Sequence, residues 1–119
     1  MNDNANKDTV LVVDDIDVNL NVVGNLLEKN NYEVVFAKSG KDALSKLEDH
    51  HPDVILLDII MPEMNGYETC KKIKKNFKSK HIPVIFLTAK SDTVDIVEGF
   101  NIGGSDFISK PLKKEELLA

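Results

Sequence analysis

The sequence predicts a doubly wound α/β fold, in which helices cover both faces of a five-stranded parallel sheet. Short apolar runs of the length of a buried strand alternate with segments whose apolar residues recur at helical spacing. The connections between these segments are short, and strands joined through helices pair in parallel with right-handed crossovers. The chain of 119 residues is long enough for one core, so we expect a single domain.

Two strands and two helices are expected in the first part of the chain. The runs TVLVV and EVVFA, at residues 9–13 and 33–37, suit buried strands. Between them, leucines and valines recur at helical spacing over residues 18–30. Ser39 is a suitable N-cap for a second helix, whose apolar face continues to about Asp49.

Three strands and three helices are expected in the remainder. The strands fall in three apolar segments, at residues 53–57, 83–87 and 106–109. One helix follows Gly66 and another covers residues 92–102, where Gly103 and Gly104 suit a left-handed helix end. A last helix begins at Lys113. The residues expected to face inward on the third and fourth helices are Tyr67, Cys70, Ile73, Phe77, Thr93, Ile96, Val97 and Phe100.

Composition argues against several classes of protein. A formal net charge of −5 and a pI near 5.1 disfavour binding to nucleic acid or to an anionic membrane through bulk electrostatics. The six lysines in residues 71–80 are interpreted as a solvated helix face and turn. Cys70 is the only cysteine, which excludes an internal disulfide and a cysteine-based zinc site.

The N-terminal residues give no sign of a targeting segment. Residues 1–8 are polar, and we expect them to form a disordered tail before a domain at residues 9–119. No apolar run approaches the ~20 residues of a membrane span. We therefore expect a cytoplasmic protein.

Polar residues follow the apolar runs of four expected strands. Asp14 and Asp15 follow the first strand, Asp58 the third, Thr88 the fourth and Lys110 the fifth. In open parallel sheets, ligands bind beyond the carboxyl ends of the strands, near the point where the strand order reverses. We therefore expect three carboxylates, a hydroxyl and an ammonium group to converge at one edge of the sheet, although they lie far apart in the sequence.

This set of groups suggests a chemistry. Two ionised carboxylates at ~4 Å repel by roughly 4 kcal/mol at an effective dielectric constant of ~20, so three of them need a counter-charge. An all-oxygen ligand set favours Mg²⁺ over zinc. One carboxylate could then attack an electrophilic phosphorus and form an acyl phosphate. Lys110 and Thr88 would contact the phosphoryl oxygens on the side away from the metal.

At these residues the chain resembles the response-regulator receiver domains of two-component signal transduction. The matching segments occur in the family's order and spacing, from about Val10 to Ala119. They are VVDD at 12–15, LLDIIMPEMNG at 56–66, IPVIFLTA at 82–89 and GGSDFISKP at 103–111. The resemblance implies a flavodoxin-like receiver fold with strand order 2-1-3-4-5. It also implies that the last helix is truncated at Ala119, so that an output domain could follow.

The resemblance implies a role for each of these residues. Asp58 matches the phosphoacceptor, and Asp14 and Asp15 match the acidic pair that holds Mg²⁺ together with Asp58 and the backbone carbonyl of Ile60. Lys110 matches the phosphate-binding lysine. The phosphoryl donor would be a sensor histidine kinase or a phosphotransfer protein. The implied function is a signalling switch and not an enzyme, with chemistry limited to its own phosphorylation and dephosphorylation.

The resemblance also implies how such a switch would work. Thr88 matches the switch hydroxyl and Phe107 the switch aromatic residue, so phosphorylation would draw Thr88 toward the phosphoryl group and let Phe107 turn inward. This would change the surface formed by helix four, strand five and helix five, through which a homodimer could also form. The peptide bond between Lys110 and Pro111 is expected to be cis.

Three alternatives stay open from the sequence. A haloacid-dehalogenase-like phosphatase would use an aspartate pair such as Asp15 and Asp17, but it also needs an acid pair at a late strand and more chain for a cap. A flavin-binding module of flavodoxin topology needs a phosphate loop rich in glycines and hydroxyls after the first strand, where this chain has acids. A receiver that only docks and is never phosphorylated is compatible with the sequence, although the full residue set counts against it.

Overall fold

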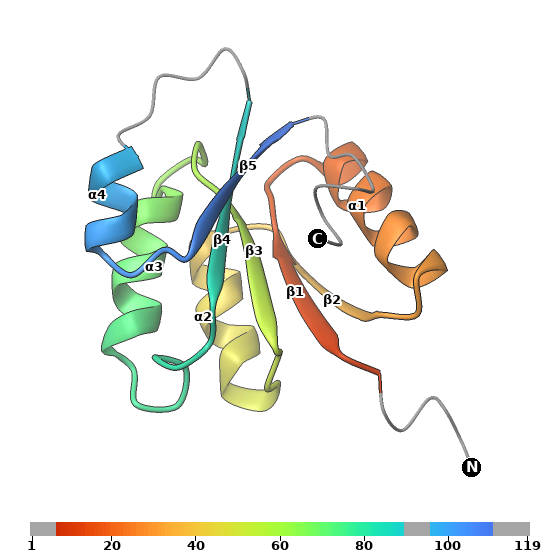
Figure 1. Cartoon of the computed structure of the whole chain (residues 1–119), viewed down its shortest axis with the longest axis horizontal. Coiled ribbons are helices and arrows are strands. Elements are labelled where there is room, and N and C mark those ends of the chain that lie inside the picture. Colours follow the sequence, from red (N-terminus) through yellow and green to blue (C-terminus); the bar gives the residue numbers. More distant parts are fainter. Residues whose placement is uncertain (1–6, 90–95, 111–119) are drawn as a thin grey trace.

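The structure is a computed structural model that describes residues 7–89 and 96–110. Its strands form one parallel sheet in the order β2-β1-β3-β4-β5 (Figure 1), which confirms the predicted fold class and strand order. The strands are β1 (Thr9–Val13), β2 (Glu33–Ala37), β3 (Val54–Asp58), β4 (Val84–Ala89) and β5 (Asp106–Lys110). The helices of the described residues are α1 (Asp17–Lys29), α2 (Gly40–Asp49), α3 (Gly66–Lys75) and α4 (Ile96–Asn101).

Three strands run further than the sequence predicts and include the polar residues at their ends. Pairing between β3 and β4 continues to Asp58, opposite Leu87, and pairing between β4 and β5 continues to Lys110, opposite Ala89. The prediction that Asp58, Thr88 and Lys110 follow their strands is therefore wrong in this detail. The sheet pairs backbone groups, so a polar side chain does not by itself end a strand.

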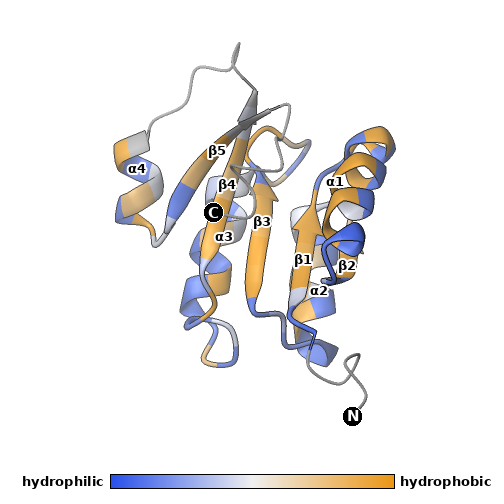
Figure 2. Cartoon of the chain, turned by 45° about the vertical axis from the view of Figure 1, so that its right-hand side comes forward, coloured by the Kyte–Doolittle hydropathy of each residue, from blue (hydrophilic) through white to orange (hydrophobic). Residues whose placement is uncertain are grey.

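Both faces of the sheet carry an apolar core. On one face, Leu11, Ile55 and Phe86 belong to a cluster that includes residues of α2 and α3. On the other face, Val12 and Leu56 belong to a cluster that includes residues of α1. Figure 1 shows α1 across the sheet from α2 and α3, and Figure 2 shows the apolar central strands between these helices. The predicted covering of both faces is confirmed.

Two helices leave apolar residues exposed that were expected to face inward. Phe77 lies beyond the last residue of α3, Lys75, and its side chain is 83% exposed. On α4, the side chains of Val97 and Phe100 are 69% and 48% exposed, whereas Gly99 is buried. Helical spacing identifies residues that share a face, but it does not show where the helix ends or which face packs.

The predicted first and last residues of α1 and α2 agree with the structure to within one residue. The hydroxyl of Ser39 accepts a hydrogen bond from the backbone N–H of Asp42 and so caps α2. Gly103 has a φ of 111° and ends α4 in a conformation that favours glycine, but Gly104 does not share it. The predicted inward residues of α3 are buried: Tyr67, Cys70 and Ile73.

Some predictions concern residues outside the described ranges. They are the tail at residues 1–6, Thr93, the side chain of Ile96, Pro111 with its peptide bond, and the helix from Lys113. Among the described helices, none has the length and apolar character needed to cross a membrane.

Candidate functional site

The central strands bring acidic residues together at one edge of the sheet. Val13 of β1 lies opposite Leu57 of β3, so the next residues, Asp14 and Asp58, are neighbours. The backbone N–H of Asp14 donates to the carbonyl of Ala37 at 3.1 Å, which continues the contact between β1 and β2. The chain reverses its direction of progress across the sheet between β1 and β3, which is where ligands bind in such folds.

Three carboxylates form a compact cluster at this edge. One oxygen atom from each of Asp14, Asp15 and Asp58 lies within 4.8 Å of the others. The side chains of Asp14 and Asp58 are buried, at 1% and 4% exposed, whereas Asp15 is open to solvent. Two unit charges at such a separation repel by about 3.5 kcal/mol at an effective dielectric constant of ~20. The structure thus brings the three predicted carboxylates together in a place that suits a cation.

The donor atoms of this cluster fit a magnesium ion. All three side chains offer carboxylate oxygens, which are the protein ligands that Mg²⁺ prefers. The Oδ1 atom of Asp14 accepts a hydrogen bond of 3.0 Å from the backbone N–H of Ile16, which orients that carboxylate. The cluster contains no histidine or cysteine that would favour zinc.

The loop between β3 and α3 is held against the end of β3. The N–H of Gly66 donates to the carbonyl of Ile59 at 2.8 Å, and a Cβ atom at position 66 would collide with the carbonyl of Asp58. Asn65 and Glu68 form a capping box that fixes the first turn of α3. The loop approaches the cluster this closely because residue 66 has no side chain. The sequence pattern indicates only that a helix follows Gly66, and it does not reveal this contact.

The remaining predicted site residues lie on or beside the same strands. Thr88 is half-buried on β4, opposite Ser109, and Ile60 is exposed in the loop after β3. The backbone of Lys110 pairs with β4, but its side chain lies outside the described part of the chain. Contact between the Lys110 ammonium group and the carboxylates therefore stays a prediction, as does metal binding by the Ile60 carbonyl.

Phe107 belongs to a row of aromatic rings that the sequence analysis did not predict. Its ring centroid lies 5.2 Å from those of Phe86 and Phe100, and Phe86 lies 5.0 Å from Tyr67. A Cβ atom at Gly99 would collide with the Phe107 ring, so this glycine makes room for it. A glycine inside a helical pattern was the available signal, because such a residue often has a packing reason.

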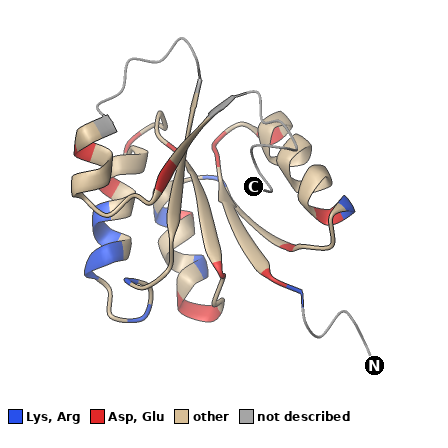
Figure 3. Ribbon diagram, in the orientation of Figure 1, with Lys and Arg blue, Asp and Glu red and all other residues tan. Residues whose placement is uncertain are grey.

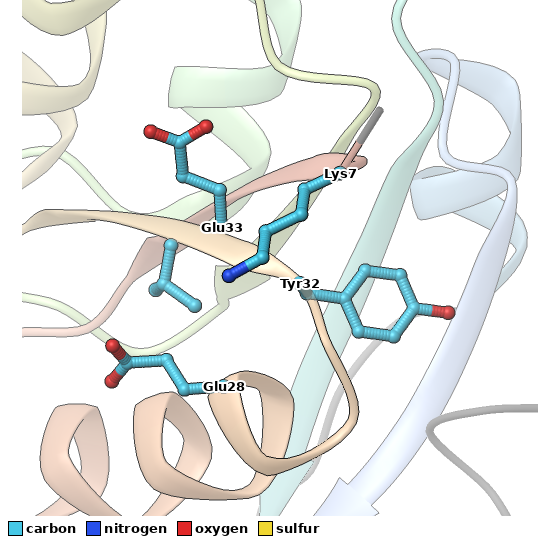
Figure 4. A pocket seen from close by; sticks show the side chains of 5 residues that line it. Lys7, Glu28, Tyr32 and Glu33 are labelled. Carbon is cyan, nitrogen blue, oxygen red and sulfur yellow. The ribbon is translucent and has the colours of Figure 1, made fainter. Parts of the chain in front are cut away.

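A separate pocket of about 410 Å³ lies away from the cluster. Figure 4 shows its lining, in which the ammonium group of Lys7 lies between the carboxylates of Glu28 and Glu33, beside Tyr32. Glu33 is the first residue of β2, whereas the carboxylate cluster lies at the other ends of the strands. This pocket is therefore not part of the candidate site.

Comparisons with known proteins identify relatives over nearly the whole chain. The family profile described as the response regulator receiver domain matches residues 10–119. Protein PilG of Pseudomonas aeruginosa is 41% identical over 109 residues, which cover 92% of this chain and 81% of PilG. The solved structure of the chemotaxis protein CheY4 of Vibrio cholerae has a TM-score of 0.88 and 33% identity, covering 94% of this chain and 93% of CheY4.

Another solved structure is similar and contains a metal. The receiver domain of the sensor histidine kinase PA1611 from P. aeruginosa, with a magnesium ion coordinated in its active site cleft, has a TM-score of 0.85 at 29% identity. The match covers 94% of this chain and 92% of that domain. Five further curated relatives, among them a response regulator and a histidine kinase, are much longer, and this chain spans only 8% to 46% of their lengths.

Proposed function

This chain belongs to the response regulator receiver family, and we propose that Asp58 is the residue that receives its phosphoryl group. A receiver domain is a phosphorylation-dependent signalling switch, and these matches do not favour the phosphatase, flavin-binding or docking-only alternatives. The observation that supports Asp58 is its place in the cluster with Asp14 and Asp15. Its position as the last residue of the central strand β3 holds the carboxylate on a rigid part of the fold.

We propose that the cluster binds Mg²⁺ through Asp14, Asp15, Asp58 and the backbone carbonyl of Ile60. The all-oxygen donor set supports this, and so does the magnesium ion in the similar receiver domain of PA1611. Bound there, the ion would offset the repulsion among the carboxylates and the charge of the incoming phosphoryl group. Asp14 would keep its orientation through its hydrogen bond with Ile16.

The proposed reaction transfers a phosphoryl group from a phosphohistidine to Asp58. An oxygen of the Asp58 carboxylate attacks the phosphorus, a P–O bond forms, the P–N bond breaks, and the imidazole that leaves takes up a proton. The Lys110 ammonium group and the Thr88 hydroxyl would donate to the phosphoryl oxygens from the neighbouring strands. In this proposal the chain catalyses only its own phosphorylation and dephosphorylation, so it is not an enzyme that converts a separate substrate.

The output surface would respond through Thr88 and Phe107. Movement of Thr88 toward the phosphoryl group would open space beside the ring of Phe107, which now packs between Phe86 and Phe100. Phe100 of α4 packs against this ring and is 48% exposed, and Val97 of the same helix is also exposed, so a change in the ring would alter an apolar surface. A homodimer or an output domain beyond Ala119 could bind there.

The phosphoryl donor would dock beside the site on α1. Ile16, Val18 and Val22 are 51%, 67% and 56% exposed, and Ile16 adjoins Asp15 of the cluster. Val18 and Val22 share one face of α1, and Ile16 is the N-cap residue before it, so this end of the helix presents an apolar surface that suits a helical partner. The proposed donor is a sensor histidine kinase or a phosphotransfer protein, and the cytoplasm is the compartment in which we expect the two to meet.

A direct test uses the chain, Mg²⁺ and a small-molecule phosphodonor such as phosphoramidate. Intact-mass measurement should find one added phosphoryl group on the wild type and none on Asp58→Asn, and EDTA should prevent the addition. Asp17→Asn is the matched control, because it removes the same charge from an exposed residue outside the cluster and should still be labelled.

Three results would overturn the proposal. An unlabelled wild type under conditions that label a known receiver domain would exclude phosphorylation at this site. Full, persistent labelling of Asp58→Asn would place the phosphoryl group on another residue. Steady release of phosphate from the donor without accumulation, unchanged in Asp58→Asn, would favour a phosphatase instead.

A further inference from the structure

A basic surface lies at the end of α3 that is remote from the carboxylate cluster. Residues 69–82 contain six lysines and no acidic residue, so the formal net charge of −5 for the whole chain leaves −11 on the other residues. Figure 3 shows this concentration of basic residues on α3 and in the turn that follows it. We use the term basic tip for Phe77 and the five exposed lysines of this segment, which are Lys71, Lys72, Lys75, Lys78 and Lys80.

Phe77 is held outward by an ordered turn. Its side chain is 83% exposed, although it continues the apolar pattern of α3. The hydroxyl of Ser79, a residue that is only 2% exposed, donates to the carbonyl of Ile73 at 2.8 Å. The side-chain oxygen of Asn76 accepts a hydrogen bond of 2.9 Å from the N–H of Lys78. Because the turn is fixed on both sides of Phe77, the exposure of this ring is a feature of the fold.

The charge of the basic tip is not neutralised within the described part of the chain. Two salt bridges join described residues, one between Lys38 and Asp17 and one between Lys46 and Asp42, and neither involves the tip. The ammonium group of Lys80 lies 5.3 Å from the centroid of the Phe77 ring. The tip therefore presents an exposed aromatic ring next to the Lys80 ammonium group, with four more exposed lysines on the same segment.

We propose that the basic tip binds an anionic phospholipid surface, with Phe77 inserted at the headgroup level and the lysines in contact with lipid phosphates. The apolar ring of phenylalanine can insert at the boundary between the headgroups and the acyl chains, while lysine has an apolar stem and a charged end that stays among the headgroups. Lysines near an anionic bilayer each add about 1 kcal/mol of attraction, which corresponds to about a fivefold gain in partitioning. A protein partner would need a groove that matches the projecting Phe77 ring, whereas a fluid bilayer can accept the ring at any point of its surface.

The composition of the tip fits a lipid surface better than a protein or a nucleic acid. The 15 basic residues of the chain are all lysines, and protein interfaces are typically enriched in arginine and depleted in lysine. Base recognition in DNA also relies mainly on arginine, and single strands are bound by several aromatic residues rather than one. Lysine is sufficient for lipid phosphates, which need charge rather than a bidentate geometry.

The bulk charge of the chain does not oppose this binding at close range. Charges further than about 8 Å from the surface are largely screened at physiological ionic strength, so the acidic remainder of the chain has a weak effect. Gly66 adjoins Asp58 at the start of α3, and the ten residues of that helix place its far end, with Lys75, Phe77 and Lys78, about 15 Å away, whereas Lys71 and Lys72 lie about halfway along. The carboxylate cluster would therefore stay accessible on a membrane-bound chain.

The experiment uses the variant Phe77→Trp as a fluorescent probe, because the chain has no tryptophan of its own. The emission of Phe77→Trp should shift to the blue with vesicles made of equal parts phosphatidylglycerol and phosphatidylcholine, and salt should reverse the shift. Pure phosphatidylcholine vesicles and a single-stranded oligonucleotide should give no shift. Asp58→Asn in the same background should bind vesicles equally, so this test is independent of phosphorylation.

Matched charge variants complete the test. Adding Lys75→Gln and Lys78→Gln to the Phe77→Trp chain should lower vesicle partitioning about 25-fold, whereas Lys29→Gln and Lys41→Gln, at exposed sites elsewhere, should lower it less than about twofold. Equal losses in the two pairs, or no shift with anionic vesicles, would overturn the proposal. A shift with the oligonucleotide but not with vesicles would also overturn it and assign the tip to nucleic acid. Thermal melts of the Phe77 and lysine variants should be unchanged, since these side chains are exposed.

Discussion

Replacing Asp15 with asparagine should stabilise the metal-free chain and remove its stabilisation by Mg²⁺. The Asp15 carboxylate has an oxygen within 4.8 Å of oxygens from both Asp14 and Asp58. Asparagine has nearly the same shape and removes one charge from this cluster. Because Asp15 is open to solvent, the new amide group can be hydrated, and the packing should not change.

The size of the effect follows from Coulomb's law. Each pair of charges at this separation costs about 3.5 kcal/mol at an effective dielectric constant of ~20, but only about 0.9 kcal/mol at the value for water. Asp15 takes part in two such pairs and is open to solvent, so the value for water applies to each pair, and we expect Asp15→Asn to gain about 2 kcal/mol. This corresponds to a Tm increase of roughly 6–10 °C for a domain of this size.

The assay is urea unfolding followed by circular dichroism, in EDTA and in excess Mg²⁺. Mg²⁺ at a hundred times its Kd should stabilise the wild type by about 2.7 kcal/mol, and Asp15→Asn by much less. Asp17→Asn is the control. Asp17 pairs with Lys38 at 2.7 Å in the first turn of α1, so its loss should cost up to about 1 kcal/mol and leave the response to Mg²⁺ intact.

Either of two results would refute this reasoning. Asp15→Asn could be no more stable than the wild type in EDTA, which would mean that the carboxylates do not strain the metal-free fold. Alternatively, Mg²⁺ could stabilise Asp15→Asn as much as the wild type, which would place the metal elsewhere.

Three further predictions concern single residues. Gly66→Ala should lower the free energy of unfolding by about 1–3 kcal/mol in urea, because its Cβ atom would collide with the carbonyl of Asp58. Ile60→Asn should make the phosphorylated chain lose its phosphoryl group several-fold faster by intact mass, because the apolar Ile60 side chain cannot orient an attacking water. Burial raises the pKa of the Cys70 thiol from 9.0 to about 11, although the charge of Lys74 opposes the shift. The folded chain then holds this proton more tightly than the unfolded chain, so the free energy of unfolding should fall as the pH rises from 9 towards 11, and Cys70→Ala should lack this contribution in urea unfolding at several pH values.

Each of these predictions has a contradicting outcome. A Gly66→Ala chain as stable as the wild type would mean that the loop can withdraw from β3 without cost. Equal or slower phosphate loss from Ile60→Asn would remove position 60 from control of the phosphoform lifetime. Identical pH dependence in the wild type and Cys70→Ala would contradict the effect of burial on the thiol.

Much of the candidate site could be predicted from the sequence because it depends on local patterns and one rule of topology. Apolar runs identify the strands, and the acids Asp14, Asp15 and Asp58 come at or directly after their ends. In a parallel sheet with helical crossovers, all these ends share one edge. The meeting of the three carboxylates follows from this rule without any knowledge of their distances.

Other features could not be predicted because they depend on contacts between residues that are distant in the sequence. Strand pairing, not polarity, determined that β3 includes Asp58 and that β5 includes Lys110. Gly99 lies against Phe107, which leaves Val97 exposed and Phe100 in contact with the Phe107 ring by only part of its surface. The end of α3 at Lys75 leaves Phe77 in solvent. The apolar spacing in the sequence is the same whether such a residue is buried or exposed. Its surroundings are set by which segments lie beside it, and these come from other parts of the chain.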